Sequence, residues 1–171
     1  RALILKPKVL LLDEPLSALD KKLREQMQLE LRHLQRAVGI TFILVTHDQE
    51  EALTMSDRVA VMFDGKVEQV ASPRELYETP TSQRVASFIG AMNFVAGNIV
   101  SAGDQTTVSS EILGTVAIPS KNIFGDKRIN KLVLGLRPER ISITPHITNN
   151  KDKIVGVITD ASYFGETTYY K

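Results

Sequence analysis

Two short aliphatic runs flank one long amphipathic stretch near the start of the sequence. Residues 9–13 and 40–46 are almost continuously apolar, which is typical of strands covered on both faces of a sheet. Between them, apolar residues recur three or four positions apart and predict a helix over residues 20–38, which Gly39 would end. Because a strand, a long helix and a strand form a crossover unit, we expect the two strands to be parallel.

The next forty residues predict shorter elements. Asp48 and Glu51 have the spacing of a capping box and indicate a helix over residues 48–56. Two strands around Asp64-Gly65 predict a hairpin with a two-residue turn, and two further helices follow it. These strands cover residues 58–63 and 67–70, and the helices cover residues 73–78 and 82–90.

The pattern changes near residue 93, where the helical period disappears. Short apolar runs bounded by Gly, Pro, Asn, Asp and Ser predict an all-β domain, a small barrel or sandwich. We therefore divide the chain into domains at 1–92 and 93–171. Both ends look cut through secondary structure, so we expect a longer chain and an incomplete β-domain. The predicted runs are 94–100, 106–110, 131–137, 139–144 and 153–159.

Composition excludes several classes of protein. Hydrophobic residues make up 43% and charged residues 24%, as in a globular protein, and no apolar run approaches the roughly 18 residues of a spanning helix. A formal net charge of +1 gives no electrostatic reason to expect nucleic-acid binding. Without cysteine there is no disulfide, thiolate metal site or cysteine nucleophile.

Polar side chains follow both strands of the predicted parallel pair. Asp13 and Glu14 end the first run, and His47 follows the second. Since ligands bind beyond the carboxyl ends of parallel strands, these three side chains suit a magnesium nucleotide. Asp13 could hold Mg²⁺ through water, Glu14 could orient or deprotonate a water, and His47 could contact the terminal phosphate. A solvated loop is the simpler interpretation of each residue taken alone.

Three short motifs resemble those of ATP-binding-cassette (ABC) ATPases. VLLLDEP (9–15) resembles the Walker B segment, SALD (17–20) the D-loop and VTHD (45–48) the switch-histidine loop. Residues 48–80 resemble importer ATPases, particularly the spermidine/putrescine, maltose and iron group. FIGAMNFVAGNIV (88–100), LGLRPERISI (134–143) and YFGETTYY (163–170) resemble the C-terminal regulatory domain of those subunits.

The resemblance implies a fold and a set of site residues. It implies the C-terminal part of an α/β, P-loop-NTPase-like ABC ATPase domain, followed by an all-β regulatory domain of the oligomer-binding (OB) type. Asp13 would coordinate Mg²⁺ through water, Glu14 would be the catalytic base, and His47 would be the switch residue at the γ-phosphate of ATP. Ser17 and Asp20 would lie at the dimer interface and couple its two nucleotide sites.

The resemblance also implies partners and a location. Two copies of the ATPase subunit would close around ATP and drive a membrane permease, which receives its solute from a binding protein. The subunit would lie at the cytoplasmic face of a bacterial membrane and would not bind nucleic acid. The 171 residues contain neither G-x-x-x-x-G-K-[ST] nor LSGGQ, so we expect them to be inactive by themselves.

Other functions are compatible with the same motifs. The transported solute is predicted to be a polyamine from the resemblance alone, and a sugar or iron importer of the same group is an alternative. A non-catalytic regulatory or dimerisation module would need only the β-domain. An ABC ATPase that acts on DNA or ribosomes is a third possibility, although the β-domain favours import.

Overall fold

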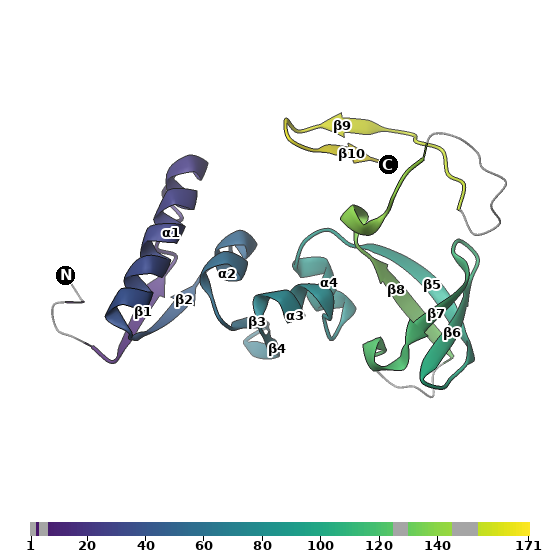
Figure 1. The fold of residues 1–171 in the computed structure, drawn as a ribbon, viewed down its shortest axis with the longest axis horizontal. Helices are drawn as coiled ribbons and strands as arrows, with labels where there is room; N and C mark the ends of the chain where they lie inside the picture. The colour runs from purple at the N-terminus through teal and green to yellow at the C-terminus, as the bar shows by residue number, and fades with distance from the viewer. Residues whose placement is uncertain (1–2, 4–6, 125–129, 145–153) are drawn as a thin grey trace. The chain divides into compact units, whose positions relative to one another are not determined.

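The computed structural model describes residue 3 and residues 7–124, 130–144 and 154–171. These residues form two compact units that divide between Met92 and Asn93, except that Phe124 groups with the first (Figure 1). All α-helices of the described ranges lie in the first unit. None of these helices combines the length and the apolar character that a membrane span requires.

The first unit begins with a parallel pair of strands. β1 (Val9–Asp13) pairs with β2 (Thr41–Val45) in a register that places Asp13 opposite Val45. α1 (Lys21–Val38) connects them; the Asp20 side chain caps its N-terminus, and Gly39, with φ of 69°, ends it. The predicted parallel arrangement and the predicted helix are therefore confirmed.

The prediction that both strands are covered on both faces is wrong for the structure as described. Exposure alternates along each strand, and the four aliphatic side chains of one face are 46–71% exposed. The described part of the chain covers only the opposite face of this two-stranded pair. A continuous apolar run therefore does not mean that this chain itself covers both faces. The exposed aliphatic face consists of Val9, Leu11, Ile43 and Val45.

Helix α2 (Gln49–Met55) is capped differently from the predicted capping box. The Asp48 side chain accepts hydrogen bonds from the backbone N–H groups of Glu50 and Glu51, as predicted. The reciprocal bond from Glu51 to the Asp48 N–H is not formed, because Asp48 N donates to Thr46 Oγ1 instead, at 3.0 Å. The Thr46 hydroxyl in turn donates to the Glu51 carboxylate.

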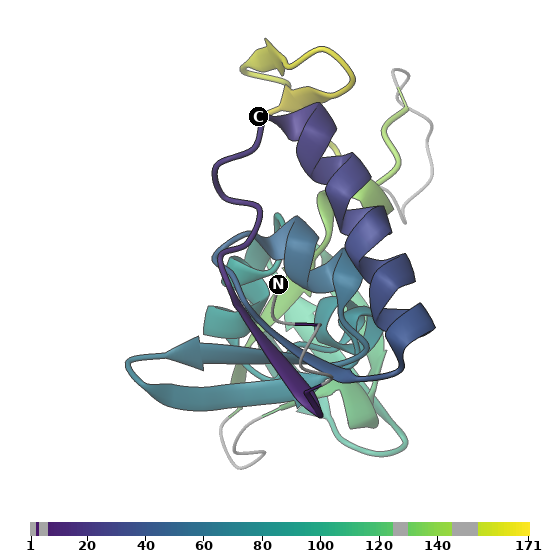
Figure 2. The same cartoon turned by 90° about the vertical axis from the view of Figure 1, so that its left-hand side faces the viewer.

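The remainder of the first unit packs a hairpin against two short helices. β3 (Val59–Phe63) and β4 (Lys66–Ala71) form an antiparallel hairpin (Figure 2). Its turn places Asp64 and Gly65 at φ of 52° and 74°, as a type I′ turn requires. The predicted hairpin is confirmed. Helices α3 (Pro73–Glu78) and α4 (Gln83–Phe88) follow it. The core of this region consists of Val59, Val61, Ala71, Leu76, Val85 and Ile89.

The second unit is all-β among its described residues, as predicted. Its main sheet is antiparallel in the order β7-β6-β5-β8, around the buried side chains of Val95, Val108 and Leu134. The four strands are β5 (Asn93–Ser101), β6 (Gln105–Ser110), β7 (Gly114–Pro119) and β8 (Lys131–Leu136). A separate hairpin consists of β9 (Ala161–Tyr163) and β10 (Thr168–Tyr170).

Two of the predicted β-runs differ in the structure. The run at 139–144 is not a strand: it begins inside the 3-10 turn η3 (Pro138–Arg140), where Pro138 fixes φ and lacks an N–H for sheet pairing. The run at 153–159 begins outside the described residues, and residues 154–159 form no assigned strand. Strand β7 was not predicted; a second 3-10 turn, η2 (Ser120–Asn122), follows it.

Candidate functional site

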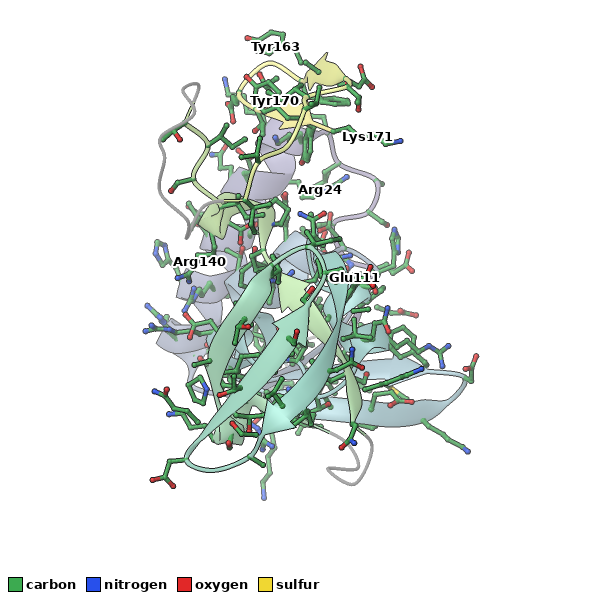
Figure 3. All side chains as sticks on the ribbon, turned by 90° about the vertical axis from the view of Figure 1, so that its right-hand side faces the viewer. Arg24, Glu111, Arg140, Tyr163, Tyr170 and Lys171 are labelled. Carbon is green, nitrogen blue, oxygen red and sulfur yellow. The ribbon has the colours of Figure 1, made fainter. Side chains whose placement is uncertain are left out.

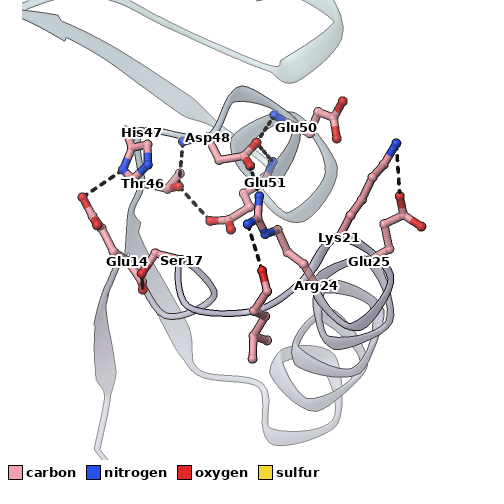
Figure 4. A network of polar contacts seen from close by, with 11 residues as sticks. Glu14, Ser17, Lys21, Arg24, Glu25, Thr46, His47, Asp48, Glu50 and Glu51 are labelled. Carbon is pink, nitrogen blue, oxygen red and sulfur yellow. Dashed lines mark hydrogen bonds and ion pairs between the residues drawn. The ribbon is translucent and has the colours of Figure 1, made fainter. Parts of the chain in front are cut away.

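The side chains of Glu14 and His47 meet at the carboxyl ends of the parallel strands. Oε1 of Glu14 lies 3.0 Å from Nδ1 of His47 (Figure 4). Glu14 immediately follows β1, and His47 lies two residues after the end of β2. The backbone N–H of Glu14 continues the ladder by donating to Val45 O at 2.8 Å. The predicted approach of the second carboxylate to the imidazole is therefore present in the structure.

Glu14 adopts a backbone conformation that is unusual for its residue type. Its φ is 43°, in the left-handed region that residues other than glycine rarely occupy. The chain turns sharply here, and the Glu14 carbonyl oxygen accepts bonds from both the N–H and the hydroxyl of Ser17, at 3.3 and 3.0 Å. Strained residues of this kind concentrate at functional sites, and this one directs its carboxylate towards the neighbouring strand end.

The contact between Glu14 and His47 is open to solvent. The side chains are 48% and 74% exposed respectively. Since a carboxylate can only accept, Nδ1 of His47 carries the proton of this bond. Such an exposed pair contributes about 0.2–1 kcal/mol, so it orients the two groups without locking them. Within the described residues Oε2 of Glu14 has no hydrogen-bond partner, and it can accept a proton or a hydrogen bond.

The other sequence-predicted site residues lie between the end of β1 and the start of α1 and have different contacts. Asp13 is the last residue of β1, with an exposed side chain. The Ser17 hydroxyl is bonded to the Glu14 carbonyl, so it supports the turn at Glu14. The Asp20 carboxylate accepts from Leu23 N at 3.1 Å as the α1 cap. Asp20 is therefore not part of the contact between Glu14 and His47.

Sequence reasoning missed a second layer of side chains behind this contact. Nη1 of Arg24 lies 2.9 Å from Oδ2 of Asp48. Nη2 of Arg24 donates to the carbonyl oxygen of Leu19 at 3.0 Å. No sequence signal pairs Arg24 with Asp48, because the pairing depends on how the crossover helix returns to the sheet. The helix-cap pattern did identify Asp48, although only for its local role.

Thr46 joins the end of β2 to α2. Its hydroxyl donates to Oε2 of Glu51 at 2.7 Å and accepts from Asp48 N. The Glu51 side chain is almost fully buried, at 2% exposure, so this hydroxyl satisfies a carboxylate that would be costly to leave without a donor. The two hydrogen bonds of the Thr46 hydroxyl, to Glu51 and to Asp48 N, therefore hold the loop that carries His47.

The oxygen donors at the strand ends fit one hard cation only in part. No group of three or more potential ligands among His, Asp and Glu occurs in the described ranges. Mg²⁺ is commonly bound through one or two carboxylates and several waters, with the remaining oxygens supplied by a phosphate. The exposed carboxylate of Asp13 beside Glu14 meets that minimal requirement, and these residues supply no further ligand.

Comparison with known proteins identifies one family model and several similar proteins. Residues 134–171 match the family model for the TOBE domain. The chain is 47% identical, over 99% of its length, to the spermidine/putrescine import ATP-binding protein PotA of Ruegeria pomeroyi, and covers 45% of that protein. The PotA protein of Vibrio parahaemolyticus is 49% identical over 98% of the chain, which covers 44% of it.

Among solved structures, cbiO1 from Clostridium perfringens, part of the ABC transporter complex cbiONQ, is 37% identical with a TM-score of 0.42; the match covers 44% of this chain and 30% of that one. The chain spans about 45% of the length of the import proteins named above. Across 98–99% of its residues, the chain is similar in sequence to part of these import ATP-binding proteins.

Proposed function

We propose that this chain carries the Walker B half of the ATP-hydrolysis site in the ATPase subunit of an ABC importer. The observation that carries the proposal is the 3.0 Å contact between Glu14 and His47 at the carboxyl ends of adjacent parallel strands. The identity of 47–49% to ATP-binding proteins of spermidine/putrescine import supports both the ATPase assignment and a polyamine as the transported solute.

The residues of this site have distinct proposed roles. Asp13 would hold Mg²⁺ through water, and the cation would neutralise charge on the phosphates of ATP when bound. Glu14 would accept the proton of the attacking water on its carboxylate. His47 would leave Glu14 and donate a hydrogen bond to the terminal phosphate, which is consistent with its 74% exposed side chain.

The domain organisation and the partners are part of the same proposal. Residues 1–92 would be part of the nucleotide-binding domain, and residues 93–171 would belong to the regulatory domain. Ser17 and Asp20 would lie at the contact with a second copy of the subunit. The dimer would act on a permease at the cytoplasmic face of the membrane, and the permease would receive its solute from a binding protein.

The Glu14→Gln variant of the intact protein tests the proposed chemistry. The amide keeps the size and the hydrogen-bonding reach of the side chain but does not act as a base, so we expect ATP hydrolysis to fall about 100-fold or more. ATP binding, measured by equilibrium dialysis in the presence of Mg²⁺, should remain within a few-fold of the wild-type value. Equal loss of binding and hydrolysis would show that Glu14 has a structural role instead.

The solute requires a separate experiment. In cells that lack the gene, the intact protein should restore uptake of labelled spermidine or putrescine, and the Glu14→Gln variant should not. Restored uptake of maltose or iron without polyamine uptake would favour the alternative importers of the same group. A protein that restores no uptake but hydrolyses ATP would favour a role outside transport.

A further inference from the structure

We propose that Arg24 is a positioning residue that sets the placement of His47 against Glu14. Its guanidinium bridges the loop that follows β1 and the loop that follows β2. This inference concerns the internal geometry of the chain, and it depends on the proposed function only where it predicts an effect on hydrolysis.

The contacts of Arg24 reach both loops at once. The side chain extends from the first turn of α1, where Nη2 donates to the Leu19 carbonyl and Nη1 donates to the Asp48 carboxylate. The Arg24 and Asp48 side chains are only 30% and 24% exposed. The planar fork of a guanidinium can hold two acceptors in fixed directions, which the single ammonium of lysine cannot do in the same way.

Asp48 transmits this constraint to His47. Oδ2 of Asp48 accepts a hydrogen bond from Arg24. Its Oδ1 caps α2 by accepting from Glu50 N and Glu51 N. The carboxylate is thus held from two sides, and His47 is the residue immediately before it in the chain.

The contacts close a ring (Figure 4). Glu14 is bonded to Ser17 in the turn after β1, and this turn leads to the carbonyl that Arg24 binds. Arg24 binds Asp48, and His47, the residue before Asp48 in the chain, contacts Glu14. The two loops are therefore joined twice, by an exposed contact that is easily broken and by a half-buried, charge-assisted contact that is stronger.

A second arginine on α1 provides a matched control. Nη1 of Arg32 donates to the carbonyl oxygen of Thr54 at 2.7 Å, so it also links α1 to α2. This contact lies at the end of α2, away from the loop that carries His47. Replacing either arginine by methionine removes one link between the same two helical regions, but only Arg24→Met removes the bridge between the loops.

The direct test measures how strongly Glu14 and His47 sense each other in the intact protein. With ¹³C-labelled histidine, the ring signal of His47, assigned by its loss in His47→Gln, should shift when Glu14 is replaced by glutamine. We expect this shift to be retained in the Arg32→Met background and reduced by more than half in the Arg24→Met background. An undiminished shift in Arg24→Met would overturn the inference, whatever the protein's activity.

Hydrolysis gives a second readout. We expect Arg24→Met to lower kcat about ten-fold with little change in the KM for ATP, because misplaced reacting groups slow chemistry more than binding. Arg24→Lys should recover only part of the loss, and Arg32→Met should stay close to wild type. Complete recovery by lysine would show that charge alone matters, which would contradict the proposed bridge.

Asp48→Asn keeps the test decisive if Arg24→Met fails to fold. Asparagine retains the cap of α2 and removes the charge that binds Arg24, so it should reproduce the reduced His47 shift. A normal shift in Asp48→Asn would overturn the inference. Failure of the proposed function is separable, because the Glu14→Gln variant would then retain ATP hydrolysis while the coupling between the two loops persisted.

Discussion

At the scale of single residues, the loop after β2 is fixed by polar contacts rather than by apolar packing. Thr46 bonds to Asp48 and Glu51, and Asp48 also bonds to Arg24 and to two N–H groups of α2. The side chain of Glu51 is buried. The sequence indicated Glu14, His47 and the cap role of Asp48, because strand ends and cap spacings are local patterns. It gave no indication of Arg24, whose partner is 24 residues away along the chain.

The buried carboxylate of Glu51 predicts a cost for removing the Thr46 hydroxyl. Thr46→Val keeps the shape of the side chain but leaves Oε2 of Glu51 without this donor, so we expect a loss of about 1–3 kcal/mol in the free energy of unfolding. Urea unfolding measures it. Thr41→Val, at an exposed position of β2, the strand that precedes Thr46, should change stability by less than about 0.5 kcal/mol. Equal effects at both positions would contradict the role of the hydroxyl.

At the scale of elements, hydrophobic periodicity located the helices and the hairpin of the first unit well. Cap and turn residues such as Asp20, Gly39 and Gly65 act locally, so the sequence alone marked where those elements begin or end. Periodicity was less informative in the second unit, where the alternating run 139–144, which follows Pro138, forms no strand and strand β7 was not predicted. Strand pairing there depends on contacts that are distant in sequence.

Gly97 shows how closely the strands of the second unit pack. A Cβ atom at this position would lie 2.6 Å from Cγ1 of Val108, whose side chain is fully buried. We therefore expect Gly97→Ala to destabilise the sheet by about 1–3 kcal/mol. Gly103→Ala, where the nearest atom is a backbone oxygen at 3.7 Å, is the matched control. Thermal unfolding followed by circular dichroism compares them; equal midpoints would show that Val108 adjusts without cost.

At the scale of the whole molecule, apolar surface remains exposed in both units. One face of the β1–β2 pair presents four aliphatic side chains, and the β9–β10 hairpin presents Tyr163 and Tyr170, which are 76% and 57% exposed (Figure 3). The sequence predicted covered strands for β1 and β2, because apolar patterns indicate what a fold tends to bury but not which segment covers it.

The exposed face of β1 and β2 predicts self-association of the 171-residue polypeptide. Contiguous aliphatic surface favours association, so we expect Val45→Thr to lower both the binding of a hydrophobic dye and the sedimenting mass. Val100→Thr replaces a similarly exposed valine of the other unit and should change neither. If both substitutions act alike, the β1–β2 face is not the associating surface.

The openness of the Glu14–His47 contact has a consequence for exchange of partners. Because both side chains are already exposed to water, separating them exposes little additional surface, and the free energy required to break the contact is small. An incoming anion can therefore capture the imidazole in competition with the carboxylate and free that carboxylate in the same event. This hydrogen bond breaks readily when the imidazole binds a stronger partner, and it forms again when that partner dissociates.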